Sequence, residues 1–353
     1  MNYDFQKLAH AYRNQPFNFK IKQQAEDFIV SENLGFEPSG SGEHAYLYLE
    51  KISCSTPHAR EVLARYFKIK PLDVGYSGLK DKHAVTRQWF SIKTNARCEE
   101  LCGKFVLGHD GSTPSIKILT VTRNARKLKI GSHKTNHFEL VLRDVSSPDC
   151  ASDCDTIANS FDKTLDKIIH SGFPNYFGNQ RFGLDASNLD KAMAMFVQGS
   201  KCSRDKRGIY LSTAQSYLFN AQLDSRVAED TWRSYKNGDR FVLAGSKSYF
   251  SIDGSSQRET LEASQRIAAN DIAVASDLSK LDPSIDPMLE VFQQGLRNAK
   301  VREMVRPFSV VPTKLEATWD FDQGKPRLSM AFYLPTGSYA TALIKELGDI
   351  HHR

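Results

Sequence analysis

The chain has 353 residues, of which 40% are hydrophobic and 25% are charged, and its formal net charge is +6. This length excludes a single small domain, and the composition supports a sizeable core. No apolar run approaches the roughly 20 residues that a transmembrane helix needs, and the N-terminus lacks the basic and apolar regions of a signal peptide. We therefore expect a cytoplasmic protein with no membrane partner. The modest positive charge allows a polyanionic partner without requiring one.

The first predicted elements are a strand and a helix. Residues Ala45–Leu49 alternate aromatic and aliphatic side chains after a glycine-containing turn, which is typical of a strand. Thr56 is the expected N-cap of the following helix, with Pro57 at its first helical position. Apolar residues then recur at helical spacing, and Pro71 limits the helix.

The next segment, 75–93, is predicted to be a loop that leads into a strand. Its first half carries two glycines and a charged centre around Asp81, whereas Thr86–Ile92 is aromatic and β-prone. Asp81 lies between Lys80 and Lys82, and nearby cations favour the ionised carboxylate that a nucleophile or a general base needs. A solvated surface turn is the alternative for a lone aspartate, because loop charges are usually exposed.

A strand and a helix are also predicted at the end of the first half of the chain. The segment that begins at Asn136 alternates, with Phe138, Leu140 and Leu142 on one face of a half-buried strand. Apolar residues at helical spacing then predict a helix that ends at Gly172.

The second half of the chain changes from helices to strands. Helices are predicted over Ser212–Glu229 and Pro287–Met304, and Arg327–Leu334 alternates as a strand does. Ser338 is the expected cap of a last helix, which ends at Gly348. Strand-rich ends around a helix-rich middle indicate one domain that is interrupted by an insertion.

Two basic clusters are candidates for contact with a nucleic-acid backbone. The denser cluster contains no acid, and its candidate RNA-binding residues are Arg123, Arg126, Lys127, Lys129 and Lys134. The second cluster comprises Lys201, Arg204, Lys206 and Arg207. A solvated hairpin is the alternative for the denser cluster. Two separated clusters suit a large folded RNA better than a small metabolite.

The six cysteines include two pairs with C-x3-C spacing, Cys98 with Cys102 and Cys150 with Cys154. A zinc site would need a second close pair or nearby histidines, so we expect reduced thiols and no metal site. The sequence also lacks the phosphate-loop, dinucleotide-binding, zinc-protease and serine-hydrolase motifs. An enzyme with this sequence would work with its side chains alone and without a cofactor.

The sequence resembles the TruD family of pseudouridine synthases in six motifs that occur in the family's order. The segment Gly78–Trp89, GLKDKHAVTRQW, resembles the catalytic signature. The N-terminal, Asn-x-Phe, two inserted-domain and C-terminal motifs are resembled by Glu26–His44, Lys134–Val145, Pro174–Gly183, Leu211–Asn220 and Leu334–Leu347. The resemblance therefore spans nearly the whole chain.

The resemblance implies an α+β fold, in which an inserted α/β domain specific to TruD interrupts a pseudouridine-synthase catalytic core with a mixed, mainly antiparallel sheet. The core would comprise residues 1–171 and 305–353, and the insertion would comprise residues 172–304. The implied activity is isomerisation of uridine to pseudouridine in tRNA, typically at uridine 13, without metal or cofactor. tRNA is the expected partner, and we expect a monomer.

The resemblance makes Asp81 the catalytic nucleophile and implies a set of substrate-binding residues. They are Phe28 at the target base, Asn136 and Phe138 as the Asn-x-Phe pair, Lys22 near the carboxylate, and Tyr339 where some relatives carry Phe. The target base must leave its stack, and three routes for Asp81 then stay open: addition to C6, attack on C1′, or removal of a sugar proton. A non-catalytic RNA-binding protein and a metal-dependent RNA-modifying enzyme are the alternative functions.

Overall fold

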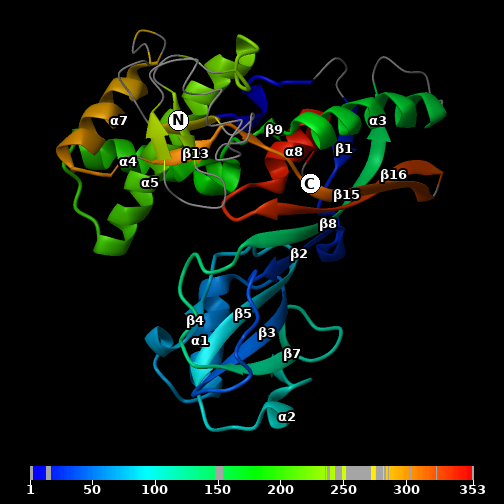
Figure 1. Cartoon of the computed structure of the whole chain (residues 1–353), viewed down its shortest axis with the longest axis vertical. Coiled ribbons are helices and arrows are strands. Elements are labelled where there is room, and N and C mark those ends of the chain that lie inside the picture. The colour runs from blue at the N-terminus through cyan, green and yellow to red at the C-terminus, as the bar shows by residue number, and fades with distance from the viewer. Residues whose placement is uncertain are drawn as a thin grey trace. The chain divides into compact units, whose positions relative to one another are not determined.

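The computed structural model describes residues 3–12, 17–147, 154–234, 236, 239–242, 249–251, 272–275, 281, 284, 286–302, 304–322 and 324–351. The chain forms two units (Figure 1). Unit 1 comprises Met1–Asn14, Asp162–Val311 and Ser338–Leu347, and unit 2 comprises Gln15–Phe161, Pro312–Gly337 and Gly348–Arg353. The expected insertion, 172–304, falls within the sequence range of unit 1, and its boundaries stay a prediction.

Unit 2 contains one 11-stranded mixed sheet. Its main path runs through β15 (Thr313–Asp322), β16 (Lys325–Pro335), β8 (Thr135–Ser146), β2 (Phe28–Asn33), β5 (Val85–Lys93), β3 (His44–Ile52), β7 (Ser115–Asn124) and β6 (Phe105–Leu107). Off this path, β1 (Phe17–Lys20) pairs with β8 and β17 (Gly348–His351), and β4 (Gly75–Tyr76) pairs with β5. Among the described strands of this sheet, the β2–β5 and β1–β17 pairs are parallel and the others are antiparallel.

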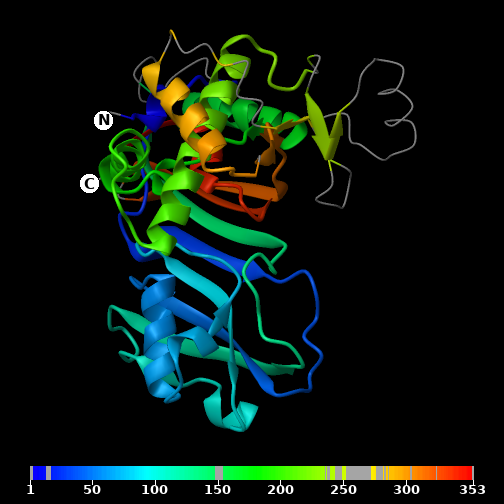
Figure 2. The same ribbon diagram turned by 90° about the vertical axis from the view of Figure 1, so that its left-hand side faces the viewer.

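Helix α1 (Thr56–Tyr66) covers one face of this sheet, as Figures 1 and 2 both show. Its buried residues Ala59, Val62 and Leu63 share a hydrophobic core with residues of β3, β5 and β7. The one-turn helix α2 (Cys98–Leu101) contributes Leu101 to the same core. Burial of these apolar side chains stabilises the unit by about 25 cal/mol for each Å² removed from water. Two short 3-10 turns, η2 (Ala25–Asp27) and η3 (Pro71–Asp73), complete the connections.

The N-cap of α1 is Ser55, so the predicted cap at Thr56 was wrong by one residue. The Ser55 hydroxyl accepts a hydrogen bond from the backbone N–H of His58, 3.3 Å away, as an N-cap should. Thr56 is the first helical residue, and its buried hydroxyl donates to Oε1 of Gln88 on β5. The Thr56 hydroxyl, which the sequence assigned to the cap, therefore binds Gln88 of the sheet instead.

Strand β8 confirms the predicted alternation, because Phe138, Leu140 and Leu142 are all buried. The helix after it, α3 (Cys154–Ser171), ends at Gly172 as predicted. Gly172 has a φ of 75°, and a Cβ there would lie 2.6 Å from the carbonyl oxygen of Val310, so only glycine fits.

Unit 1 is mainly helical. Helices α4 (Ser187–Val197), α5 (Arg204–Ala228) and α7 (Pro287–Asn298) pack against one another, as Figure 1 shows. Phe292 of α7 lies at their centre, with ring centroids 5.5 Å from Tyr217 and 6.0 Å from Phe196. The remaining elements are β11 (Tyr249–Ser251), β10 (Arg240–Val242), β12 (Ile272–Ala275) and β13 (Val305–Pro307) in one sheet, β14 (Ser309–Val310) with β9 (Phe173–Pro174), helix α8 (Ala340–Leu347), and η1 (Phe5–Lys7), η4 (Asn179–Arg181) and η5 (Leu184–Ala186).

Two helix boundaries differ from the sequence prediction. Helix α5 begins at Arg204, eight residues before the expected Ser212, because residues 203–209 are exposed and therefore carry no apolar pattern. Helix α7 ends at Asn298 rather than at Met304. It cannot continue further because Lys300, two residues later, adopts a φ of 51°, which is not helical. Among the described residues, no helix has the length and apolarity to cross a membrane.

Candidate active site

The loop that carries Asp81 joins β4 to β5 and is held from two sides. The backbone N–H of Lys80 donates to the hydroxyl of Thr56 at 3.0 Å, and the Gln88 amide donates to the carbonyl oxygen of Gly78 at 3.1 Å. Thr56 and Gln88 are themselves hydrogen-bonded at 2.9 Å. The first residue of α1 and a buried residue of β5 thus fix the backbone immediately before the candidate nucleophile.

The Asp81 carboxylate forms an ion pair with the ammonium group of Lys22, and both side chains are less than one-fifth exposed. Its other oxygen accepts the backbone N–H of His83 at 3.1 Å. Burial raises the pKa of Asp81, but the charge and hydrogen bond of Lys22 and the His83 N–H outweigh burial, so the pKa lies below its usual value. The carboxylate is therefore ionised at neutral pH, and its partner is Lys22 rather than the flanking lysines.

Lys22 occupies a left-handed backbone position, with a φ of 54°, in the turn after β1. Such a conformation is uncommon for a residue with a side chain and is often found at functional sites. The Lys22 ammonium lies 4.2 Å from the centroid of the Phe28 ring. Lys22 thus joins the start of β2 to the Asp81 loop.

Phe28 and Phe138 pack against each other on β2 and β8. Their ring centroids are 6.3 Å apart in an edge-to-face arrangement, and Phe138 stacks on Phe332 of β16 at 5.5 Å. Phe28 is 4% exposed and Phe138 is 6% exposed. The structure brings both rings, Lys22 and Asp81 into one continuous set of contacts, and a role of either ring at the target base stays a prediction.

Asn136 belongs to the same region, because it lies on β8 directly opposite Glu32 of β2. Its side-chain oxygen accepts a hydrogen bond from the ammonium group of Lys80 at 2.9 Å. The Lys80 ammonium also lies 2.8 Å from the Glu32 carboxylate, and these two side chains are 4% and 0% exposed. Burial raises the pKa of Glu32, and the neighbouring Lys80 opposes this shift.

His133 lies beside this ion pair. Its Nδ1 is 2.6 Å from the Ser77 hydroxyl and 3.8 Å from the Glu32 carboxylate. Burial and the charge of Lys80 lower the pKa of His133 to about 4, so the imidazole is neutral at pH 7. A Cβ at Gly78 would lie 2.7 Å from the His133 ring, which explains the glycine two residues before Lys80.

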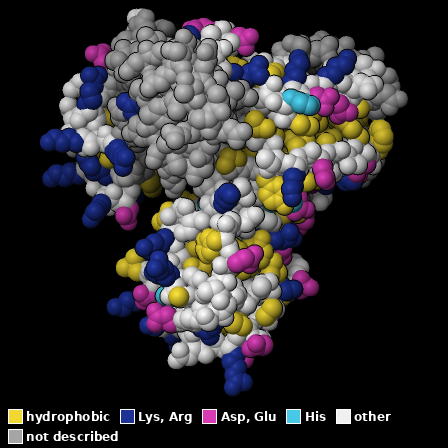
Figure 3. All heavy atoms as spheres, in the orientation of Figure 1, with side chains coloured by type: hydrophobic (Ala, Val, Ile, Leu, Met, Phe, Trp, Pro, Cys, Tyr) yellow, Lys and Arg dark blue, Asp and Glu magenta, His cyan; other side chains and the backbone are white. Residues whose placement is uncertain are grey.

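Three of the five predicted RNA-binding residues in the denser cluster, Arg126, Lys129 and Lys134, are exposed. All three lie in the connection between β7 and β8 or at its end, 125–134. Figure 3 shows Asp and Glu side chains beside Lys and Arg side chains on the visible face. The three exposed cations lie in a single connection of unit 2.

The other two, Arg123 and Lys127, bind the protein's own backbone. The Arg123 guanidinium donates to the carbonyl oxygens of Thr94, at 2.6 Å, and Ala96. The Lys127 ammonium donates to the carbonyl oxygen of Leu72. A role for these two in RNA binding stays a prediction, but both have a structural partner.

Tyr339 belongs to unit 1 and precedes α8, whereas the other predicted site residues belong to unit 2. It is half-buried, and its ring centroid lies 5.8 Å from that of Phe177. The guanidinium carbon of buried Arg306 lies 4.0 Å from the Phe177 ring and 5.8 Å from the Tyr339 ring. Tyr339 is thus part of an aromatic group around a buried arginine.

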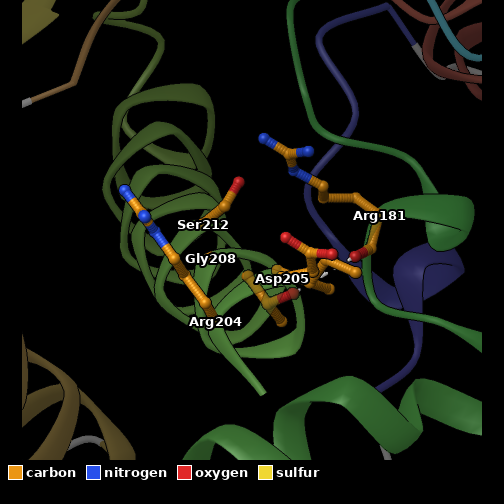
Figure 4. Close-up of a pocket in the computed structure, with 7 residues that line it drawn as sticks. Arg181, Arg204, Asp205, Gly208 and Ser212 are labelled. Atoms are coloured by element: carbon orange, nitrogen blue, oxygen red, sulfur yellow. Dashed lines mark hydrogen bonds between the residues drawn. The ribbon is translucent and has the colours of Figure 1, made fainter. Parts of the chain in front are cut away.

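A pocket of about 490 Å³ lies in unit 1 and contains none of the predicted substrate-binding residues (Figure 4). Figure 4 shows Arg181 and Arg204 on opposite sides, with Asp205 and Ser212 between them. All four residues of the second basic cluster, Lys201, Arg204, Lys206 and Arg207, are exposed, and three of them lie in the first turn of α5. An acid in the lining makes this pocket a mixed-charge site rather than a purely cationic one.

Cys98 is the first residue of α2 and Cys102 is its C-cap, and the Cys102 thiol donates to the carbonyl oxygen of Leu119 at 3.1 Å. Cys150 lies outside the described residues, as does the side chain of Cys154. Within the described part of the chain, no group of three or more histidine, cysteine or acidic side chains is placed to hold a metal ion.

Sequence reasoning missed Glu32, His133 and Lys51 as buried ionisable groups near the site. Lys51 of β3 is 0% exposed, donates to the Cys54 carbonyl oxygen at 2.8 Å, and has its pKa lowered to about 8, chiefly by burial. A signal existed for Glu32, because it shares one face of β2 with Phe28 and Val30 at a spacing of two. An acid that continues an apolar strand face is rarely left without a cation.

Comparisons with known proteins agree over most of the chain. The family model described as "tRNA pseudouridine synthase D (TruD)" matches residues 6–204 and 200–347. A protein from Methylococcus capsulatus named "tRNA pseudouridine synthase D" is 33% identical over 97% of this chain and 94% of its own. One of the same name from Haemophilus influenzae is 36% identical over 93% of each chain.

A solved structure from Methanosarcina mazei whose title also names tRNA pseudouridine synthase D superposes with a TM-score of 0.64 at 19% identity. The match covers 96% of this chain and 95% of that chain. The likeness confirms the expected α+β fold class with its mixed, mainly antiparallel sheet.

Proposed function

The chain belongs to the TruD family of tRNA pseudouridine synthases, and from this premise we propose that Asp81 is the nucleophile that isomerises uridine 13. The coarser activity, isomerisation of uridine to pseudouridine in tRNA, is that of the family. We further propose that the enzyme works as a monomer in the cytoplasm, where its tRNA substrate is found.

The reaction exchanges one bond for another. The bond between N1 of uracil and C1′ of ribose breaks, the base turns, and a bond between C5 and C1′ forms. C5 loses its proton and N1 gains one, so the atoms and electrons balance without an oxidant, a reductant or a second substrate. The protein must therefore extract the base, stabilise the separated fragments and exchange these protons.

The ion pair between Asp81 and Lys22 carries the proposal. It keeps a shielded carboxylate ionised within a loop that α1 and β5 fix. The electrostatic interaction of a charged group with a nearby charge is stronger in a shielded site than in water, because the local dielectric constant is lower. The carboxylate could add to C6 of the base, attack C1′ or remove a sugar proton, and a nucleophilic role covers the first two routes.

Around this carboxylate, we propose that Phe28, Asn136, Phe138 and Lys22 bind the flipped nucleotide. Removing the base from its stack costs a few kcal/mol, which aromatic contacts can return at about 1–3 kcal/mol for each base. We propose that Tyr339, a half-buried residue before α8, also contacts the substrate.

We propose that tRNA binds through exposed cations of both units. In unit 2 these are Arg126, Lys129 and Lys134, and in unit 1 they are those at the start of α5. Phosphate contacts supply most of the affinity of such complexes and little of the sequence preference. Loss of Asp81 should therefore abolish turnover and leave tRNA binding intact.

The test measures tritium release from tRNA that carries 5-tritiated uridine, together with the Kd for tRNA. Asp81→Asn keeps the shape and removes the charge, and Asp73→Asn, at an exposed position of η3, is the matched control. We expect release by the wild type and the control and none by Asp81→Asn. Appreciable pseudouridine formation by Asp81→Asn would refute the role of this carboxylate. Unchanged release from a tRNA with cytidine at position 13 would refute the proposed target.

A further inference from the structure

Lys80 precedes Asp81 in the chain, but its side chain points away from solvent. Its ammonium lies 2.8 Å from the Glu32 carboxylate and donates to Asn136 Oδ1 at 2.9 Å. Glu32 and Asn136 are paired residues on the adjacent strands β2 and β8. One cation therefore ties the Asp81 loop to two neighbouring strands.

Glu32 anchors this arrangement. Its side chain is fully buried, and its second oxygen accepts the backbone N–H of Trp89 at 3.2 Å. A buried ion pair is weak support for stability by itself, because both charges must give up their water. The ion pair does fix the position of the Lys80 side chain. The ammonium has one acceptor on β2 and another on β8, and it cannot move away from either without losing that contact.

The contact with Lys80 determines which way the Asn136 amide faces. An ammonium group can only donate, so the oxygen of the amide must face Lys80 and its NH2 group must face elsewhere. Within the part of the chain that the structure describes, the Asn136 NH2 group donates no hydrogen bond to another residue. The Asn136 side chain as a whole is only 8% exposed, and its NH2 group keeps some contact with solvent.

An oriented donor beside the Asp81 loop suits a carbonyl acceptor of the target base. Uracil has two such oxygens, O2 and O4. When the ring turns about its N3–C6 axis, N1 and C5 exchange places, and O2 and O4 exchange with them. A single fixed donor therefore meets a carbonyl oxygen both before and after the turn. In cytosine an amino group replaces O4, so a donor at this place would oppose another donor in one of the two orientations.

We propose that Lys80 is a positioning residue that, anchored by Glu32, orients Asn136 so that its NH2 group donates to a carbonyl oxygen of the flipped uracil. The inference rests on the proposed function and extends it to the recognition of the base. Loss of one oriented donor at a reacting group typically costs about 10²–10³-fold in rate. tRNA affinity should change little, because it comes from phosphate contacts elsewhere.

The first experiment separates positioning from charge neutralisation. Lys80→Met is expected to lower the single-turnover rate of pseudouridine formation by about 10²–10³-fold, with the tRNA Kd within a few-fold of the wild type. Adding Glu32→Met removes the unpaired buried charge and should restore the melting temperature but not the rate. Recovery of the rate together with the melting temperature would overturn the proposal. Lys82→Met, at an exposed lysine on the other side of Asp81, is the matched control and should keep the wild-type rate.

The second experiment tests the donor itself and does not depend on the folding of the double variant. Asn136→Asp keeps the shape and the contact with Lys80 but has no NH2 group, and at pH 8 it should lose the same factor in rate. tRNA with 2-thiouridine or 4-thiouridine at the target position replaces one acceptor oxygen by sulfur, a poorer acceptor. If the donor contacts that oxygen, the sulfur slows the wild type but adds little to the defect of Asn136→Asp.

The outcomes are distinct. Equal slowing of the wild type and Asn136→Asp by both thio substitutions would overturn the donor contact. A wild type that forms no pseudouridine would instead refute the proposed function, because the inference concerns only how fast an active enzyme works.

Discussion

His133→Asn should make the protein less sensitive to acid than the wild type. In the native state, the His133 pKa is lowered to about 4, with burial as the main cause and the Lys80 charge as the second. In the unfolded state the pKa is that of an ordinary histidine, about 6.5. Below pH 6.5, His133 is therefore protonated in the unfolded chain but stays neutral in the folded protein. This difference favours unfolding.

The magnitude follows from these two values. Above pH 6.5, His133 is neutral in both states and does not change the unfolding free energy. As the pH falls from 6.5 to 4, the unfolding free energy decreases steadily. The wild type should lose about 2 kcal/mol from this group between pH 7 and pH 5, and about 3 kcal/mol by pH 4. At about 2–4 °C for each kcal/mol in a domain of this size, the first figure corresponds to about 4–8 °C in Tm. His133 is 7% exposed, so solvent screens little of this effect.

The assay is the melting temperature as a function of pH for the wild type and His133→Asn. Asn retains an oxygen near the position of Nδ1, which can accept the Ser77 hydroxyl. The raised pKa of Glu32 also contributes to the pH dependence, but this carboxylate is present in both proteins. His109→Asn, at an exposed histidine of the same unit, is the control. Parallel curves for the wild type and His133→Asn between pH 7 and pH 5 would refute the argument.

Three further predictions concern the exposed cations, the thiols and Phe28. Arg126→Ala and Lys129→Ala should each reduce the slope of the logarithm of the tRNA binding constant against the logarithm of salt concentration by about 0.7–0.9, if each cation neutralises one phosphate. An unchanged slope would show that both side chains are solvated and do not contact tRNA. Cys98→Ser with Cys102→Ser should leave pseudouridine formation intact, as should a chelator, whereas stoichiometric zinc in the purified protein would contradict this. Phe28→Ala should lower kcat/KM because the ring is proposed to stack on the base, and it should also lower the unfolding free energy by about 3–5 kcal/mol because the ring is buried. A large fall in Tm with a normal kcat/KM in the folded protein would assign the ring to the core alone.

Local patterns predicted individual elements well. The alternation in β8 and the glycine stop of α3 depend on residues close in sequence, and both are confirmed. The cap of α1 was wrong because Ser55 and Thr56 are equally suited to it by type, and the contact with Gln88 decides between them. The early start of α5 was missed because its first turns face solvent and carry no apolar pattern.

The candidate site depends on partners that sequence does not bring together. The Lys22–Asp81 pair joins residues 59 positions apart, and the resemblance, not the spacing, pointed to Lys22. Lys80 was interpreted only as a cation beside Asp81, because nothing local shows that its side chain turns towards Glu32. The order of strands in the sheet could not be predicted either, because pairing between distant segments leaves no periodic pattern in the sequence.

The position of β8 between β2 and β16 constrains how the protein can fold while it is being synthesised. β2 and β8 leave the ribosome early, but β16 begins at Lys325, some 180 residues after β8 ends at Ser146. At about 5–20 residues per second, this delay amounts to about 10–35 s. During that interval the edge of β8 that receives β16 is an open template for other strands, and β1 waits even longer for β17. The length of the segment between β8 and β16 therefore sets the delay before these strands can pair. Shortening this segment should reduce the need for chaperones during synthesis, independently of any effect on tRNA.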